Sequence, residues 1–261
     1  MKNRPTIFKS LMLLFLVMSV ALAPALSAQP LAKRNAAAGR IPCTATQESP
    51  QASATINLGI ACDNNFAVYL GSCCSANALV GNNSCDLNEC IRHGQAYTIS
   101  GITGDSFLYV VAWSDSGVAQ GLLASLGPGP MTAIPPSKIL GGDSRWQVFS
   151  TGIAFPGSPP AGSGNTIHPT KKFQKILNQQ IGFACDNNLW QTPVNGATNV
   201  SGNNVAGAGA LAPPVSVVDP NARWMWFQSS KPACAGVQSP FAPGCDHGEY
   251  LIFRLPLSYV P

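Results

Sequence analysis

Charged residues are scarce in this chain, and so are the side chains that usually carry catalysis. Charged residues make up 10% of its 261 residues, and only three residues are histidines. Residues 1–28 hold three of the 15 basic residues and none of the 11 acidic ones, which leaves 12 basic and 11 acidic residues, a net charge of +1. Binding to phosphate backbones needs clustered Lys and Arg, so this balance argues against nucleic acid as the partner.

No set of residues typical of an enzyme stands out. Gly104-Asp105-Ser106 resembles the nucleophile block of GDS-type esterases, but no Asp is followed three positions later by the His that such enzymes use as a base. Glycoside hydrolysis needs two acids about 5 to 9 Å apart, and no pair is evident among the few acids of this chain. We therefore expect residues 104–106 to form a turn between strands.

Residues 1–28 are predicted to be a cleaved signal peptide. Lys2, Arg4 and Lys9 precede an apolar run at residues 11–23, and small residues allow cleavage after Ala25 or Ala28. The run is too short for a good membrane span, which needs roughly 20 apolar residues. The chain is thus expected to be secreted and extracellular, without a membrane span. Residues 29–54 are expected to be a flexible lead-in.

Nine cysteines follow the predicted signal peptide. In a secreted chain this usage predicts disulfides, and the odd number leaves one thiol free or paired between molecules. No Cys-x-x-Cys element is present, which argues against zinc. Spacing does not determine the connectivity, although pairs within residues 73–90 and between 234 and 245 are favoured, and a bond between Cys62 and Cys185 is allowed. The candidates are Cys43, Cys62, Cys73, Cys74, Cys85, Cys90, Cys185, Cys234 and Cys245.

Short runs rich in β-branched and aromatic residues are separated by Gly, Asn and Asp, a pattern typical of strands and turns. Strands are expected at residues 55–60, 66–70, 96–102, 107–113, 144–150, 223–228 and 249–257. Residues 118–126 are compatible with a helical turn or a buried strand. The 25 Gly and 22 Pro residues leave little room for long helices, and residues 173–180 are the best helix candidate.

The last of these strands has apolar side chains on both faces. Side chains alternate along a strand, so the even-numbered residues from Tyr250 to Arg254 lie on one face and the odd-numbered residues from Leu251 to Leu255 on the other. Such a strand is predicted to be central in a sandwich.

The pentapeptide Ala-Cys-Asp-Asn-Asn occurs twice, at residues 61–65 and 184–188. The first copy lies in IACDNNFAVYLG, which resembles the strand–turn–strand segment of secreted galactose-binding-like jelly-roll domains. Four later segments resemble that family in the same order, namely FLYVVAWSDSGVAQGLLASL, GDSRWQVFSTG, ARWMW and EYLIFR. A fainter likeness connects the chain to secreted spherulins of the second class.

The short strands and the lack of a strong mid-chain linker predict one all-β domain at residues 55–261. The resemblance implies that this domain is a single jelly-roll or galactose-binding-like β-sandwich with long loops and disulfides. The second copy of the pentapeptide aligns with the family's Phe-Asp-Asp-x-x-Trp turn, which implies that Asp186 caps a turn and that Trp190 covers the sandwich. A cysteine-rich insert at residues 73–90 occupies a loop of the family's pattern.

Sugar-binding sandwiches use aromatic faces together with polar side chains from loops at one end. The candidate ligand-binding residues are Asp63, Asn64, Trp113, Asp186, Asn187 and Trp190. The alternative is that each Trp packs in the core, as expected where Trp224 and Trp226 share a face, and that each Asp bonds its own backbone. No cofactor is expected, with a structural calcium ion held by loop oxygens as the alternative.

Asn82 and Asn199 begin Asn-x-Ser sequons in stretches that look like exposed loops, which makes both glycosylation candidates. The function that fits best is a secreted, non-catalytic protein that binds carbohydrate or belongs to a wall or matrix. Two alternatives stay open. One is a secreted hydrolase, either a GDS-type esterase using Ser106 or a glycoside-active enzyme, and the other is an effector that binds a protein partner through its cysteine-rich segment.

Overall fold

The computed structural model describes residues 54–83, 93–114, 120–127, 138–155, 167–200, 214–228, 241 and 249–257. These residues belong to one compact unit, Ala36–Pro261. The predicted signal peptide and nearly all of the lead-in lie outside the described residues, as do Cys43, Cys85, Cys90, Cys234 and Cys245. Within the described ranges no helix has the length and apolar character needed to cross a membrane.

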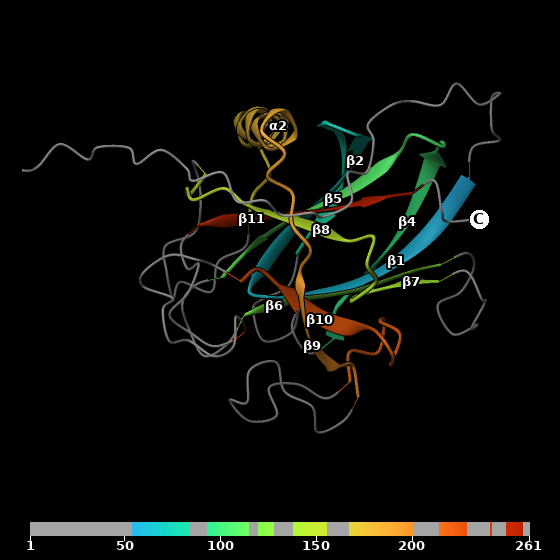
Figure 1. Cartoon of the computed structure of the whole chain (residues 1–261). Helices are drawn as coiled ribbons and strands as arrows, with labels where there is room; N and C mark the ends of the chain where they lie inside the picture. Colours follow the sequence, from blue (N-terminus) through green and yellow to red (C-terminus); the bar gives the residue numbers. More distant parts are fainter. Residues whose placement is uncertain are drawn as a thin grey trace, which may run out of the picture. The chain divides into compact units, whose positions relative to one another are not determined.

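Two antiparallel sheets form the fold (Figure 1). The six-stranded sheet has the order β4-β1-β6-β10-β9, with β7 paired to β6. Its strands are β1 (Ala54–Asp63), β4 (Gln95–Ile102), β6 (Gly121–Gly127), β7 (Ile139–Leu140), β9 (Val194–Thr198) and β10 (Arg223–Trp226). The five-stranded sheet has the order β3-β2-β5-β11-β8. Its strands are β2 (Asn65–Ser72), β3 (Ser75–Asn82), β5 (Phe107–Trp113), β8 (Gln147–Ser150) and β11 (Tyr250–Pro256).

The main core lies between the two sheets. Alternate residues of β1 and β10, including Leu58 and Trp226, meet alternate residues of β5 and β11, including Val110 and Phe253. Large apolar side chains contribute about 1.5 to 3 kcal/mol each when fully buried, so this interface is the principal source of stability. The predicted all-β sandwich is confirmed.

A second apolar cluster covers the outer face of the five-stranded sheet. The helix α2 (Lys171–Asp186) buries Phe173, Leu177, Ile181 and Ala184, which recur on one side of the helix, against this face. In Figure 1, α2 lies on the side of β2, β5 and β11 that faces away from β9 and β10. Both faces of the five-stranded sheet are therefore buried, and every residue of β5 and β11 is buried, as the apolar pattern of residues 249–257 predicted.

The helix begins and is anchored through specific polar contacts. The Thr170 hydroxyl accepts a hydrogen bond from the Phe173 backbone N–H at 3.1 Å, the usual N-cap arrangement. Asn178 pairs with the backbone of Ala76 on β3, accepting from its N–H at 2.7 Å and donating to its C=O at 3.1 Å. Because β3 is an edge strand, these bonds occupy backbone groups that would otherwise be open to another chain.

Most predicted strands are confirmed. Residues 118–126 were compatible with a helical turn or a buried strand, and residues 121–126 belong to the buried strand β6. Two expectations need correction. The helix candidate at residues 173–180 is part of a longer helix that ends at Asp186. The cysteine-rich insert is not a loop throughout, because its residues 75–82 form β3, with Cys73 and Cys74 in the turn after β2.

The two copies of the pentapeptide adopt different structures. The first copy is the corner where the chain leaves one sheet for the other, with Asp63 ending β1 and Asn65 starting β2. The Asn64 backbone N–H donates to the Trp113 carbonyl at 3.1 Å, and the Asn83 side chain donates to the Asn64 carbonyl at 2.9 Å. The predicted turn after β1 is therefore confirmed.

The second copy forms the end of α2. Asp186 is the last helical residue and Asn187 is the C-cap. Asn188 follows with a φ of 53°, a left-handed conformation that Asn tolerates at helix ends, and the Leu189 N–H donates to the Ala184 carbonyl at 2.9 Å. The expectation that Asp186 caps a turn of the sandwich is wrong, because the buried face of α2 extends the helix through Ala184.

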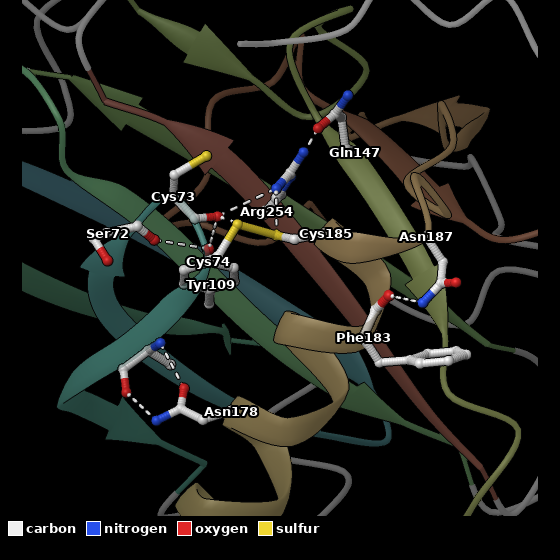
Figure 2. Close-up of a disulfide and its surroundings, with 11 residues drawn as sticks. Ser72, Cys73, Cys74, Tyr109, Gln147, Asn178, Phe183, Cys185, Asn187 and Arg254 are labelled. Carbon is white, nitrogen blue, oxygen red and sulfur yellow. Dashed lines mark hydrogen bonds between the residues drawn. A yellow bond between two sulfur atoms is a disulfide. The ribbon is translucent and has the colours of Figure 1, made fainter. Parts of the chain in front are cut away.

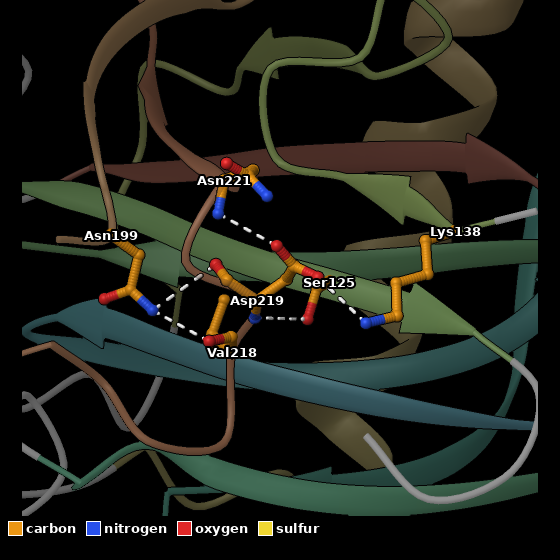
Figure 3. A network of polar contacts seen from close by, with 6 residues as sticks. All are labelled: Ser125, Lys138, Asn199, Val218, Asp219 and Asn221. Carbon is orange, nitrogen blue, oxygen red and sulfur yellow. Dashed lines mark hydrogen bonds and ion pairs between the residues drawn. The ribbon is translucent and has the colours of Figure 1, made fainter. Parts of the chain in front are cut away.

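A buried polar network joins residues near β9 and β10 to β6 (Figure 3). The Asn199 side chain, 4% exposed, donates to the carbonyls of Val215 and Val218 at 3.0 and 2.8 Å and accepts from the Val215 N–H at 2.7 Å. Beside it, Asp219 forms an ion pair with Lys138 at 2.8 Å. Asn199 thus does not lie in an exposed loop, and its amide nitrogen, the atom that a glycan would use, is already hydrogen-bonded.

The Asn82 sequon also lies in a structured position. Asn82 is the last residue of β3, is half-buried, and donates from its side-chain nitrogen to the carbonyls of Asn83 and Ile167 at 2.9 and 2.8 Å. The exposed-loop context expected for this sequon is therefore wrong as well. Glycosylation itself stays a prediction at both positions.

Candidate functional site

The six candidate ligand-binding residues do not form one site. Asp63, Asn64 and Trp113 lie at the corner between β1 and β2 and the end of β5. The other three lie at the C-terminal end of α2 and just beyond it. The first group is buried, whereas Asp186 and Asn187 are exposed. Only the end of α2 therefore offers exposed polar candidates.

Neither candidate tryptophan offers an open ring face. Trp113 is 2% exposed and Trp190 is 6% exposed, and both belong to the cluster between the five-stranded sheet and α2. Trp190 covers this outer face, as the family resemblance implied. Trp224 and Trp226 pack in the core between the sheets, as predicted from their shared face. The exposed aromatic side chain at this end is Phe183 of α2, which is 47% exposed.

Ser106 lies in the turn between β4 and β5. Its hydroxyl accepts from the Thr103 N–H at 2.9 Å, and its N–H donates to the Thr103 carbonyl at 3.0 Å. The side chain is buried, and no histidine of the described residues contacts it. The predicted turn is confirmed, and the geometry around Ser106 is that of a turn rather than of an activated nucleophile.

A disulfide joins the end of α2 to the turn after β2 (Figure 2). Cys74 and Cys185 are bonded, with 6.2 Å between their Cα atoms and a sequence separation of 111 residues. Cys73 is also disulfide-bonded, whereas Cys62 is a buried free thiol. The allowed pair of Cys62 with Cys185 is therefore wrong, and a free thiol is present, as the odd cysteine number allowed.

Next to this disulfide lies a buried arginine, Arg254 of β11, which is 4% exposed. Its Nε donates to the Gln147 side-chain oxygen at 2.7 Å, and its Nη1 donates to the Cys73 carbonyl at 3.2 Å. Nη1 also lies 3.5 Å from the Sγ of Cys185. The guanidinium stacks over the Trp190 ring, 4.0 Å from its centroid. We call Arg254, Gln147, Tyr109 and Trp190 the arginine centre.

Sheet register explains why these residues meet. Arg254 is opposite Tyr109 on β5 and opposite Gln147 on β8, so the three side chains form a row across the outer face of the sheet. The Tyr109 hydroxyl donates to the Ser72 carbonyl at 2.8 Å in the turn that carries the disulfide. The row lies where α2 ends, and the last turn of α2 has no basic residue of its own. The C-terminal end of a helix carries a partial negative charge, and Arg254 contacts this end through the Cys185 sulfur.

The charge of Arg254 has no formal counter-charge within the described part of the chain. Neither described ion pair involves Arg254, and its contacts there are with an amide, a carbonyl, sulfur and aromatic rings. Burial lowers the pKa of Arg254 to about 10, an effect that the nearby Tyr109 partly offsets. Burial likewise raises the pKa of Tyr109, with Arg254 acting in the opposite direction. Arg254 stays charged at neutral pH.

The arginine centre also has an excess of hydrogen-bond donors. Among the described residues, the buried Trp190 Nε1–H has no hydrogen-bond partner, and the same holds for the Tyr69 hydroxyl, which is opposite Tyr109 in the sheet. Unpaired buried donors cost free energy, of order 1 to 3 kcal/mol each.

The described residues contain no group of three or more His, Cys, Asp or Glu side chains that could hold a metal ion. Their ion pairs are Lys138 with Asp219, which joins the segment before β7 to the turn before β10, and Arg145 with Asp143, which lies within the turn between β7 and β8. The structural calcium ion stays a prediction.

No protein-family model matches the chain, and neither a curated protein nor a solved structure matches it. The resemblance to galactose-binding-like domains therefore stays a prediction.

Sequence reasoning did not select the arginine centre as a site. One signal was present, because Arg254 is the single charged residue in a strand that is otherwise apolar on both faces. A charge at such a position must be buried, and buried charges usually need specific partners. The identity of those partners depends on the register of β5, β8 and β11, which spacing along the chain does not reveal.

Proposed function

We propose that this chain is a secreted, non-catalytic protein that binds carbohydrate. The observation that carries the proposal is the exposed end of α2, where an aromatic ring and polar side chains are exposed together. Aromatic surface combined with a small number of polar groups is typical of sites that bind small molecules. Phe183, Asp186 and Asn187 supply exposed apolar and polar groups at the same end.

Two further features support a binding role outside the cell. The disulfide between Cys74 and Cys185 fixes the end of α2 against the turn that contacts Arg254, and such cross-links persist in oxidising compartments. The hydroxyl of Ser106 is engaged in its own turn, which favours binding over hydrolysis.

The direct test is binding of the oxidised, mature protein to an array of glycans. We expect selective binding by the wild type, weakened by substitution at Asn187 or Phe183, which are exposed and need not alter the core. Arg223→Met provides a matched control, because Arg223 is an exposed arginine on β10 of the other sheet. Absence of binding to every glycan by a correctly folded protein would refute the proposal and favour a structural role in a wall or matrix.

A further inference from the structure

The disulfide between Cys74 and Cys185 is partly exposed to solvent and lies against a buried cation. Both cysteines are only partly buried, and the nearby residues Ser72 and Asp186 are exposed. On the buried side, the Nη1 of Arg254 lies 3.5 Å from the Cys185 Sγ (Figure 2). A small thiol can therefore approach this bond from solvent, while one of its two sulfurs contacts a guanidinium.

The guanidinium makes Cys185 the better leaving sulfur. Arg254 is 4% exposed and pairs with no carboxylate among the described residues, so a thiolate at Cys185 would supply a counter-charge for it. The end of α2 acts in the opposite direction with about half a negative charge, but the guanidinium carries a full charge and contacts the sulfur directly. A sulfur whose thiolate is stabilised leaves faster in thiol–disulfide exchange.

We propose that the bond between Cys74 and Cys185 is a thiol-exchange site, in which an external dithiol attacks the Cys74 sulfur and Cys185 leaves as a thiolate held by Arg254. A bond forms between the dithiol and the Cys74 Sγ, and the bond between the two cysteines breaks with its electron pair on the Cys185 Sγ. The second thiol of the reagent then displaces Cys74. The dithiol is oxidised to a disulfide and the protein disulfide is reduced by two electrons; one proton ends on Cys74 and the other passes to solvent.

The exchange would release the end of α2 from the turn after β2. The contacts of Asn178 with Ala76 and the buried face of α2 continue to hold the rest of the helix. The released end carries the exposed Phe183 and Asn187, so the state of this bond would determine how firmly the proposed carbohydrate site is held. That consequence rests on the proposed function, whereas the exchange chemistry does not depend on it.

The experiment treats the oxidised, folded protein with glutathione, a monothiol that forms the mixed disulfide, and stops the reaction with N-ethylmaleimide. Peptide mass spectrometry then maps both labels. The expected result is glutathione on Cys74 and maleimide on Cys185, in at least about 10-fold excess over the reverse arrangement. Arg254→Lys keeps a positive charge and should keep most of this excess, whereas Arg254→Gln should lose it. Arg223→Gln, on β10 of the other sheet, is the matched control and should react like the wild type.

The wild-type mapping decides the proposal even if the Arg254 variants misfold. Equal labelling of the two cysteines, or glutathione mainly on Cys185, would overturn it. The same holds if neither cysteine reacts in the folded protein under conditions in which the urea-unfolded protein reacts. Because carbohydrate binding is not measured in this experiment, a failure of the proposed function leaves its result unchanged.

Discussion

The disulfide between Cys74 and Cys185 should be a major source of the stability of the folded domain. It closes a long loop, because its cysteines are 111 residues apart. The loop-entropy relation gives about 4.8 kcal/mol for a loop of this length when the rest of the unfolded chain is free. Measured disulfide contributions are often smaller than the loop-entropy value, so we expect Cys74→Ala combined with Cys185→Ala to lose about 3 to 5 kcal/mol.

Thermal and urea unfolding of this double variant, followed by circular dichroism, test the expectation. For a domain of roughly 200 residues the loss corresponds to a melting temperature lowered by about 6 to 20 °C. The urea dependence of the free energy of unfolding should steepen, since the uncrosslinked unfolded chain exposes more surface. Cys62→Ala serves as the control, because it removes a buried cysteine that forms no cross-link.

A double variant that melts within about 2 °C of the wild type, with an unchanged fold, would refute the reasoning. It would mean that the unfolded chain without the disulfide is already so compact that the cross-link removes little of its entropy.

Three further outcomes are expected. Asn199→Ala should lower the free energy of unfolding by about 3 kcal/mol, because it leaves buried backbone groups of Val215 and Val218 unpaired; Asn199→Asp should not restore it, as measured by urea unfolding. Burial alone would raise the pKa of Asp219, but hydrogen bonds from Lys138 and Asn221 and the charge of Lys138 lower it below its ordinary value. The ionised Asp219 therefore stabilises the fold fully above about pH 4, and this stabilisation is lost as the pH falls further. Acid unfolding of Asp219→Asn should lack this pH-dependent loss of stability. Burial, with a smaller contribution from the neighbouring acidic side chain, raises the pKa of Cys62 well above its ordinary value. Peptide mass spectrometry should show that a maleimide labels this cysteine only after unfolding. Rapid labelling of the native protein would contradict the burial of Cys62.

Most strands were predictable because their patterns are local. The β11 segment is apolar on both faces, and the structure places it between β5 and β8 with a core on each side. The β3 segment, SANALVGN, was missed because small and polar residues have low strand propensity. It becomes a strand through backbone pairing with β2 and through the hydrogen bonds of Asn178 and Gln174 to its outer edge.

The candidate site was less predictable from the sequence than the strands. Asp186, Asn187 and Trp190 were singled out from a turn motif, and the structure places them at a helix end that contributes to the arginine centre. Arg254, Gln147 and Tyr109 come from three strands that are distant in sequence, so only the pairing register of the sheet brings them together.

The repeated pentapeptide separates what the sequence determined from what the tertiary structure decided. The composition and the local apolar patterns predicted an all-β sandwich, because successive side chains of a strand point to opposite faces of the sheet. The same five residues nevertheless turn a corner between sheets at Asp63 and end a helix at Asp186. Five residues have too little intrinsic preference to choose between these states. Burial of neighbouring side chains supplies the free energy that selects one structure for each copy. Ile60 and Phe66 are buried between the sheets around the first copy, and Ile181 and Ala184 of α2 are buried against the five-stranded sheet around the second.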